Sequence, residues 1–323
     1  MLYPFTFQPI FKERVWGGRN LERLFGKKLP QGAPIGESWE ISDRPDDVSV
    51  VTNGPLSGKN LHWLLENHRQ ALLGNARSES RRFPLLIKLL DAQEKLSLQV
   101  HPPPEKAKEL GGDPKTEMWY IAHAAPGAEL YVGLNRGVTR SDFEKKIADG
   151  SVADCFHRIK VKAGDAMFLP SGRVHAIGAG LVIFEIQQNS DTTYRVFDWN
   201  RVGLDGKLRE LHVAQSLASI NFDDFEPPLI QMDSSSCSTR KRRLLVDDPL
   251  FTVDVLQLSS GTEMALHPAQ MQIIACLTGN LRVTDGETTV VLKPGQFCMV
   301  PACLKNTQVN SSGESSCVRA VAH

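Results

Sequence analysis

Residues 97–102 read SLQVHP and bring together side chains that can share one chemical task. In an extended strand successive side chains point to opposite faces, so Ser97, Gln99 and His101 lie on one face. The stretch follows the apolar run FPLLIKLL at 83–90, which favours a place deep in the protein. Buried polar side chains need partners. This face therefore predicts a common partner for the Gln99 amide and the His101 imidazole.

A second pattern, a glycine followed by five residues and a proline, occurs twice at a constant offset. The glycine begins a turn, the five residues form a strand and the proline ends it. The next strand then starts with one inward side chain. The first copy resembles the complete second signature of the cupin family, G-x5-P-x-G-x2-H, with Gly164, Pro170, Gly172 and His175.

The cupin resemblance implies a metal site inside a small β-barrel, with further ligands from an earlier strand. Gln99 and His101 lie on such a strand, and Glu117 in KTEMWY begins another. With His175 they make an N/O ligand set suited to Zn²⁺ and tolerant of Mn²⁺, Fe²⁺ or Co²⁺. The alternative is two core histidines and a surface glutamate. The complete turn signature favours the metal site, with a position open for catalysis.

The second copy of the turn motif begins at Gly295 and has Asn306 where the histidine is expected. Another stretch, Gly261 to Ala269, begins like a cupin first signature but has Ala269 in place of a second histidine. Only His267 remains of the usual ligands, and one ligand does not bind a metal tightly. This half of the chain is therefore predicted to be a structural domain without a metal.

The elements that position these residues read as short strands interrupted by helices. LHWLLENHRQALLG at 61–74 predicts an amphipathic helix that ends at Gly74. Ser141 and Glu144 predict a capping box for a helix over 141–149, and a third helix is expected over 208–220. The remaining strand-like runs lie at 128–134, 157–170, 181–188 and 192–199.

Short strands with frequent turns predict a mainly β fold. With the repeated motif, the expectation is two cupin β-barrels, each a double-sheet jelly-roll-like unit, with helical insertions in the N-terminal half. The composition changes at 226–243, where prolines and serines precede a basic run. We therefore expect a catalytic metal-binding domain over 1–225, a linker over 226–243 and a degenerate cupin domain over 244–323.

Bulk properties restrict the class of protein. The 323 residues carry 37 Lys plus Arg and 37 Asp plus Glu, so the formal net charge of zero supports neither nucleic-acid nor membrane-surface binding. The N-terminus does not read as a signal peptide, and no apolar run is long enough to span a membrane. The six scattered cysteines indicate reduced thiols in a cytoplasmic protein. A monomer or weak homodimer is expected.

Four motifs in order, LIKLLDAQEKLSLQVHP, KTEMWY, LPSGRVHAIG and EIQQNSDTTYRVFDWNR, resemble type I phosphomannose isomerase in its short bacterial form. WGG at 16–18 and GESWEIS at 36–42 are also similar to that family. The resemblance implies an aldose–ketose isomerase that interconverts mannose 6-phosphate and fructose 6-phosphate through a cis-enediol. It also implies one catalytic Zn²⁺ per chain, with the ligands Gln99, His101, Glu117 and His175.

The same resemblance places the family's active-site arginine on Arg195 and two lysines on Lys115 and Lys88. Arg195 is suited to stabilise the enediolate oxyanion, and the lysines to ring opening, proton relay or phosphate contact. Asp191, four residues before Arg195, is placed to orient it or shuttle protons. Their structural alternatives are a surface ion pair for Arg195, a turn cap for Asp191 and a side chain snorkelling to the surface for Lys88.

Substrate contacts are less specific in the sequence, because it contains no P-loop or GxGxxG motif for the phosphate. Ser97, on the ligand face, is a candidate for phosphate contact, and Trp16 for contact with the sugar. The family often has proline between the lysine and glutamate ligand, where this chain has Thr116. Two other functions stay open: a metal-dependent bicupin oxygenase and a non-enzymatic sugar-binding bicupin. The oxygenase would not need Arg195 or two inward lysines, which suit an anionic substrate, and an intact metal set argues against the non-enzymatic bicupin.

Overall fold

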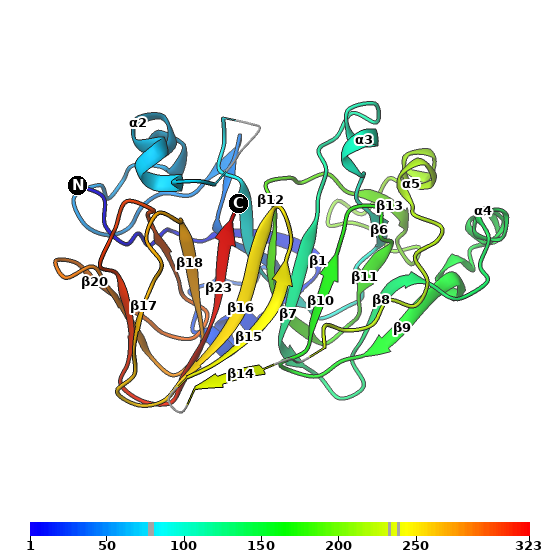
Figure 1. The fold of residues 1–323 in the computed structure, drawn as a ribbon. Helices are drawn as coiled ribbons and strands as arrows, with labels where there is room; N and C mark the ends of the chain where they lie inside the picture. Colours follow the sequence, from blue (N-terminus) through cyan, green and yellow to red (C-terminus); the bar gives the residue numbers. More distant parts are fainter. Residues whose placement is uncertain (77–80, 232–233, 238–239) are drawn as a thin grey trace.

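The computed structural model describes residues 1–76, 81–231, 234–237 and 240–323. The fold is mainly β, as the short strand-like runs predict. Two β-rich units lie side by side, with strands from residues 1–231 in the first unit and from residues 234–323 in the second (Figure 1).

Two large antiparallel sheets build the first unit. The central sheet has the strand order β1 (Ile10–Gly18), β2 (Ile35–Ile41), β5 (Leu85–Ala92), β12 (Leu181–Gln188), β7 (Glu117–Ala124) and β10 (Ala166–Leu169). The outer sheet has the order β13 (Tyr194–Phe197), β6 (Leu98–Val100), β11 (His175–Ile177), β8 (Glu129–Leu134) and β9 (Phe156–Lys160). A small ribbon pairs β3 (Asp43–Arg44) with β4 (Asp47–Val48).

The second unit also has two sheets. One has the order β14 (Ser234–Cys237), β15 (Arg240–Asp247), β16 (Phe251–Leu258), β23 (Ser315–Ala322), β18 (Gln272–Thr278) and β21 (Phe297–Val300). The other has the order β17 (Glu263–Ala265), β22 (Gln308–Ser311), β19 (Leu281–Thr284) and β20 (Thr289–Leu292). Strands β14 and β15 both begin inside the segment 226–243 expected to be a linker. Polar and charged residues are found in linkers and also in strands at a sheet edge. Composition alone therefore does not distinguish a linker from a strand in this segment.

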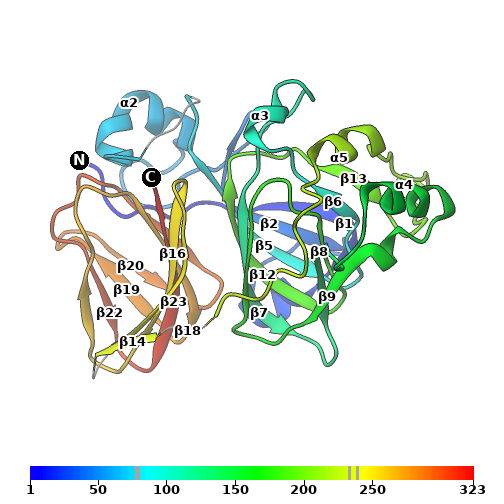
Figure 2. The same cartoon turned by 45° about the vertical axis from the view of Figure 1, so that its right-hand side comes forward.

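Helices occupy the connections of the first unit, as predicted. They are α1 (Asn20–Phe25), α2 (Leu61–Leu73), α3 (Pro104–Ala107), α4 (Arg140–Asp149), the 3-10 helix Val152–Cys155 and α5 (Val213–Ser219). Figure 2 shows α3, α4 and α5 grouped around the outer sheet. The prediction of a helix over 208–220 is wrong for its first residues. Leu208 forms a β-bridge with Val202, and the helix begins only at Val213. No helix of the described residues is long and apolar enough to cross a membrane.

Helix α4 is capped by a different pair of residues from the one expected. The side chain of Thr139 accepts a hydrogen bond from the Asp142 amide at 3.1 Å, and the Asp142 carboxylate accepts one from the Thr139 amide at 3.3 Å. The capping box is therefore Thr139–Asp142 rather than Ser141–Glu144. Both pairs have the S/T-x-x-D/E spacing, and the actual start of the helix, which the sequence leaves uncertain by a residue or two, selects between them.

Thr139→Ala is expected to lower the free energy of unfolding by about 1 kcal/mol, because the Asp142 amide loses its capping hydrogen bond to the Thr139 hydroxyl. Ser141→Ala is the matched control, because Ser141 lies two residues further along the chain and is not part of the capping box. It should change stability by less than about 0.5 kcal/mol. Urea denaturation followed by circular dichroism measures both. Equal effects of the two substitutions would contradict the observed cap.

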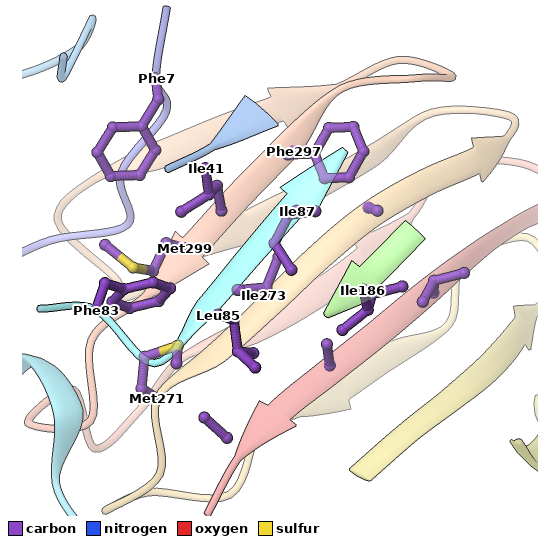
Figure 3. Close-up of a cluster of buried hydrophobic side chains, with 14 of the residues drawn as sticks. Phe7, Ile41, Phe83, Leu85, Ile87, Ile186, Met271, Ile273, Phe297 and Met299 are labelled. Atoms are coloured by element: carbon purple, nitrogen blue, oxygen red, sulfur yellow. The ribbon is translucent and has the colours of Figure 1, made fainter. Parts of the chain in front are cut away.

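The central sheet is buried on both faces. Its Leu85, Ile87 and Ile186 pack against Ile273 and Phe297 of the second unit in one apolar cluster, shown in Figure 3. On its other face, central-sheet residues form a separate cluster with residues of the outer sheet. Burial on both faces explains why β5 and β12 read as nearly continuous apolar runs. A charged residue within such a run must point to a polar interior.

The inside of the second unit is mostly apolar, apart from the buried ion pair of Asp254 and Arg319. It is filled by side chains that include Leu256, Ile274, Cys298 and Val309. Asn306, which aligns with His175 in the repeated motif, is exposed. The repeat therefore preserves the glycine–strand–proline geometry, while the side chain at the histidine position faces solvent.

Candidate active site

The outer sheet places three of the predicted residues in one row. Strand β6 pairs with β11 through Gln99 and His175, and with β13 through Gln99 and Arg195. Directly opposed residues of antiparallel strands are neighbours on one face, so Arg195, Gln99 and His175 lie side by side. His101 follows directly after the end of β6. Strand register thus joins residues that are far apart in the sequence.

Glu117 approaches this row from the central sheet, where it is the first residue of β7. Its Oε2 lies 3.4 Å from Nε2 of His101, and its Oε1 lies 3.4 Å from Nε2 of His175. All three residues are only 1% exposed. Within the described part of the chain, they form the one group of three or more His, Cys, Asp or Glu side chains with spacing suited to a metal.

Backbone carbonyls orient both imidazoles. Nδ1 of His101 donates to the carbonyl of Thr192 at 2.8 Å, and Nδ1 of His175 donates to the carbonyl of Arg173 at 3.0 Å. With the proton on Nδ1, each Nε2 carries a lone pair toward Glu117. Burial and the Lys115 charge lower the pKa of His101 to about 3, and burial also lowers the pKa of His175. Both rings are therefore neutral at pH 7, the form that binds metals.

The polar atoms of this cluster fit a divalent metal. His101 Nε2 and both carboxylate oxygens of Glu117 are buried without a hydrogen-bond partner. Lys115 Nζ lies 3.1 Å from Glu117 Oε2, but not in hydrogen-bond geometry. Burial opposes ionisation of Glu117, yet the Lys115 charge and the neighbouring histidines hold its pKa well below its usual range. An ionised carboxylate without hydrogen bonds is costly in the interior, and a bound cation offsets that cost.

Gln99 stands beside the two imidazoles as a fourth donor. Its Nε2 lies 3.2 Å from Nε2 of His175, and its Oε1 accepts a hydrogen bond from Ser97 Oγ at 3.3 Å. The two ends of an amide group have almost the same shape, so a half-turn of the amide directs the oxygen toward the imidazoles. With that oxygen, the donor set is two imidazoles, a carboxylate and an amide, which suits zinc.

A second row of polar and aromatic side chains crosses the central sheet. Strand register places Trp39, Lys88, Glu185 and Trp119 opposite one another on β2, β5, β12 and β7. Lys88 Nζ lies 3.3 Å from Glu185 Oε1 and 3.7 Å from Glu37 Oε2. The indole N–H of Trp39 donates to Glu37 at 2.7 Å, and that of Trp119 donates to Glu185 at 3.2 Å.

These charges act on one another because water is excluded. Burial alone would raise the pKa of Glu37, but the Lys88 charge and other partners lower it to about 2. The neighbouring carboxylates in turn hold the pKa of Lys88 above its ordinary value, against the effect of burial. Burial raises the pKa of Glu185, and the nearby charge of Glu117 adds to that rise. Of these carboxyls, Glu185 is therefore the most easily protonated.

A cavity of about 580 Å³ opens beside both rows. Of the residues predicted from the sequence, it is lined by Trp16, Lys88, Ser97, Gln99, Lys115, Asp191 and Arg195. Gln99 contacts His175, and Lys115 contacts Glu117, so the His–Glu–His cluster adjoins this cavity. The structure thus brings all the predicted site residues to one place, between the two sheets of the first unit.

Comparisons with known proteins agree with the family resemblance seen in the sequence. A family model described as phosphomannose isomerase type I, catalytic domain, matches residues 5–114, and a mannose-6-phosphate isomerase cupin domain matches residues 242–320. The mannose-6-phosphate isomerase of Streptococcus mutans is 38% identical over 315 residues, with 97% of each chain covered. The chain belongs to the type I phosphomannose isomerase family.

Within the phosphomannose isomerase family, ManA of Bacillus subtilis is 38% identical over 300 residues, which cover 92% of this chain and 93% of ManA. A crystal structure of mannose 6-phosphate isomerase from Bacillus subtilis has a TM-score of 0.90 at 33% identity, with 99% of both chains covered. Membership confirms the resemblance seen in the four motifs, and the second family match confirms a cupin domain in the C-terminal part of the chain.

Sequence reasoning did not single out several charged residues of this phosphomannose isomerase cavity, among them Glu37, Glu185 and Arg209. Glu185 had a readable signal, because it is a lone charge within the apolar run LVIFEIQQ, as Lys88 is within FPLLIKLL. Glu37 lies in the motif GESWEIS, whose strand contains two glutamates that alternation alone does not distinguish. Arg209 lies in an irregular segment, where no periodic pattern indicates its direction.

Proposed function

We propose that this protein interconverts mannose 6-phosphate and fructose 6-phosphate, with a metal bound by Gln99, His101, Glu117 and His175. The observation that carries the proposal is the set of buried, unpartnered donor atoms on His101 and Glu117 beside a cavity lined by cationic side chains. A metal-dependent isomerase of an anionic sugar needs both features together. The family membership supports the same reaction.

We assign one zinc ion per chain to the first unit. When bound, zinc polarises and orients the oxygens of a sugar without changing its own oxidation state. The residues of the chain supply the rest: the Nδ1 hydrogen bonds of His101 and His175 fix the directions of their ring nitrogens. The described residues of the second unit form no group of three or more His, Cys, Asp or Glu side chains spaced for a metal, and His267, the cupin-like candidate, is exposed.

The transfer of a proton between C2 and C1 passes through a cis-enediol, which requires stabilisation of negative charge. Arg195 is suited to this role, because its register partner is the ligand Gln99 and its buried Nε has no hydrogen-bond partner. Lys115, between Glu117 and Glu185, and Lys88, beside Glu185, are suited to relay protons during ring opening and transfer.

Other predicted residues would handle the body of the substrate. Asp191 lines the same cavity as Arg195 and is proposed to orient it or to shuttle protons. Ser97 is 2% exposed and contacts the ligand Gln99, which suits a contact with the phosphate or a sugar hydroxyl. Trp16 lines the cavity and is proposed to contact the sugar ring.

At the level of the whole chain, we propose two double-sheet cupin barrels with helical insertions in the first. The catalytic domain would span 1–225 and the metal-free cupin domain 244–323, with the segment 226–243 joining them. The pairing of β14 and β15 with the second unit assigns the later part of that segment to its sheet. We further propose a cytoplasmic monomer or weak homodimer, with no nucleic-acid or membrane partner.

A coupled assay tests the reaction directly. Purified, zinc-replete protein is supplied with mannose 6-phosphate, and the appearance of fructose 6-phosphate is followed with and without a chelator. Turnover that stops after chelation and returns with zinc supports the proposal. Absence of turnover in metal-replete protein rejects it, and oxygen consumption with an iron-loaded sample would favour the bicupin oxygenase.

Arg195→Ala is expected to retain zinc but to lower kcat by about 10²–10³-fold, the usual effect of losing one preorganised donor to an oxyanion. Elemental analysis and steady-state kinetics measure the two quantities. Arg140→Ala, on the exposed start of α4, is the matched control and should leave both unchanged. Unchanged turnover in Arg195→Ala would remove this residue from the mechanism.

A further inference from the structure

Arg209 lies on the wall of the active-site cavity, in the irregular segment between β13 and α5. Its Nε is 2.9 Å from Oδ2 of Asp198, and its Nη2 donates to Ser97 Oγ at 3.2 Å. Asp198 is 4% exposed, so this carboxylate is a firm anchor for the guanidinium. Among the described residues, the hydrogen bond to Ser97 is the one that the Arg209 side chain donates, so Nη1 remains available to a ligand.

The charges that act on Arg209 are mostly those of other arginines. Asp198 also accepts a hydrogen bond from Arg201 at 2.7 Å, and Arg201 has a second carboxylate partner in Glu94 at 3.5 Å. Arg195 adds a third cation nearby, and burial together with the Arg195 charge lowers the pKa of Arg209 to about 10. Asp205 also lines the cavity, but its Oδ1 accepts the Lys207 amide at 3.0 Å within the turn. An anion is the ligand that these arginine charges favour.

Apart from Arg195, which the proposed reaction uses, the other cations of the cavity are already paired with carboxylates. Lys88 lies between two carboxylates, and Lys115 lies beside Glu117. Arg14 Nε donates to Glu37 at 2.7 Å, and its Nη1 donates to a backbone carbonyl at 3.1 Å. A phosphate bound by any of these three would have to displace a carboxylate partner. Arg209 can accept a second anion without losing Asp198.

The position of Arg209 also suits one end of a sugar phosphate. It contacts Ser97, and Ser97 precedes the ligand Gln99 by two residues of an extended strand, which is about 7 Å. In a hexose 6-phosphate, four carbon atoms and the ester oxygen separate C2 from the phosphorus. That chain bridges such a spacing when C1 and C2 lie at the ligand row and the phosphate lies at Arg209.

We propose that Arg209 is the residue that binds the phosphate group of the substrate, with the Ser97 hydroxyl beside it. This inference rests on the proposed isomerase function, and it deepens that function by assigning the anion subsite. Binding at the phosphate is made equally in the ground state and the transition state, because the phosphate does not react. Its loss therefore raises KM and leaves kcat nearly unchanged.

Arg209→Gln tests the inference, with Arg201→Gln as the matched control. Arg201 shares the Asp198 carboxylate but does not line the cavity. Arg209→Gln is expected to raise KM for mannose 6-phosphate by at least about tenfold, the usual scale for one charged hydrogen bond, with kcat within about threefold. Arg201→Gln should keep both constants within about threefold. Zinc content, measured on each variant, should equal that of the original chain.

A binding measurement separates this inference from the proposed reaction. Calorimetric titration of the zinc-replete protein with inorganic phosphate should show an affinity that falls at least about tenfold in Arg209→Gln and is retained in Arg201→Gln. If the original chain binds phosphate in this way but shows no isomerase turnover, the reaction is wrong and the subsite stands. Unchanged KM and phosphate affinity in Arg209→Gln would overturn the subsite, as would equal losses in both variants. Arg209→Lys, which keeps the charge, should show an intermediate KM and guards against misfolding of the glutamine variant.

Discussion

Glu117→Gln is expected to abolish stoichiometric metal binding and to lower isomerase activity by more than about a hundredfold. Substitutions of residues that only support metal ligands cost about 10–100-fold, so loss of a direct carboxylate ligand should cost more. The glutamine has the same shape but no charge, and Glu117 faces both imidazoles at 3.4 Å. Elemental analysis of the purified protein and the coupled assay measure the two effects.

Glu40→Gln is the matched control for this substitution. Glu40 is also a buried carboxylate, 4% exposed, and its Oε1 lies 2.6 Å from Lys27 Nζ in an ion pair. It does not line the active-site cavity. Glu40→Gln should retain zinc, whatever its effect on stability. His101→Ala should lose the metal as Glu117→Gln does. Full metal stoichiometry in both His101→Ala and Glu117→Gln would show that the ligand assignment is wrong.

Lys88→Met is expected to lower the free energy of unfolding by about 3–5 kcal/mol, the usual cost of removing one partner from a buried ion pair. The lysine is 4% exposed and lies between the carboxylates of Glu37 and Glu185. Methionine fills much of the same volume, so the loss reports mainly the uncompensated charge. Chemical denaturation at pH 7 measures it.

The destabilisation by Lys88→Met should shrink as the pH falls. In the original chain the pKa of Glu37 is lowered from 4.5 to about 2, so this group stabilises the fold above pH 4.5 and loses that contribution as the pH falls toward 2. Removing the Lys88 charge raises the folded-state pKa of both neighbouring carboxyls. Their protonation then removes the unpaired charge, so the difference from the original chain is largest at neutral pH.

A double variant provides the control for this prediction. Glu37→Gln with Lys88→Met removes one cation and one of its two carboxylate partners, so it should recover part of the stability lost in Lys88→Met. It should also depend less on pH between 7 and 4.5, because fewer buried carboxyls remain to be protonated. A loss in Lys88→Met that is independent of pH would assign the effect to packing instead of charge.

Local patterns predicted the fold where the residues alone decide the conformation. The helix expected over 61–74 is α2, and the run at 181–188 is strand β12. Predictions failed where backbone pairing between two neighbouring segments decides the conformation, because composition does not show which segments pair. The β-bridge from Leu208 to Val202 removes the first part of a predicted helix, and the pairing of β14 with β15 turns part of a predicted linker into sheet.

Strand alternation and the cupin-like turn were sufficient to select Gln99, His101, Glu117 and His175, because ligand type and spacing are local properties. The sequence also determined that Lys88 needs a polar environment, since it interrupts an apolar run. It did not determine which carboxylates supply that environment. Glu37 and Glu185 lie on β2 and β12, the two strands beside β5 in the central sheet.

The sequence by itself therefore determined the kind of chemistry, the metal ligands to test and the family to which the chain belongs. Only the tertiary structure decided how the charges are paired, and through that pairing where an anion can bind. The physical reason is that a charge in a water-poor interior is governed by the few groups within several ångströms of it. Those groups, such as Asp198 and Ser97 around Arg209, are brought together by strand register and irregular segments that no local pattern encodes.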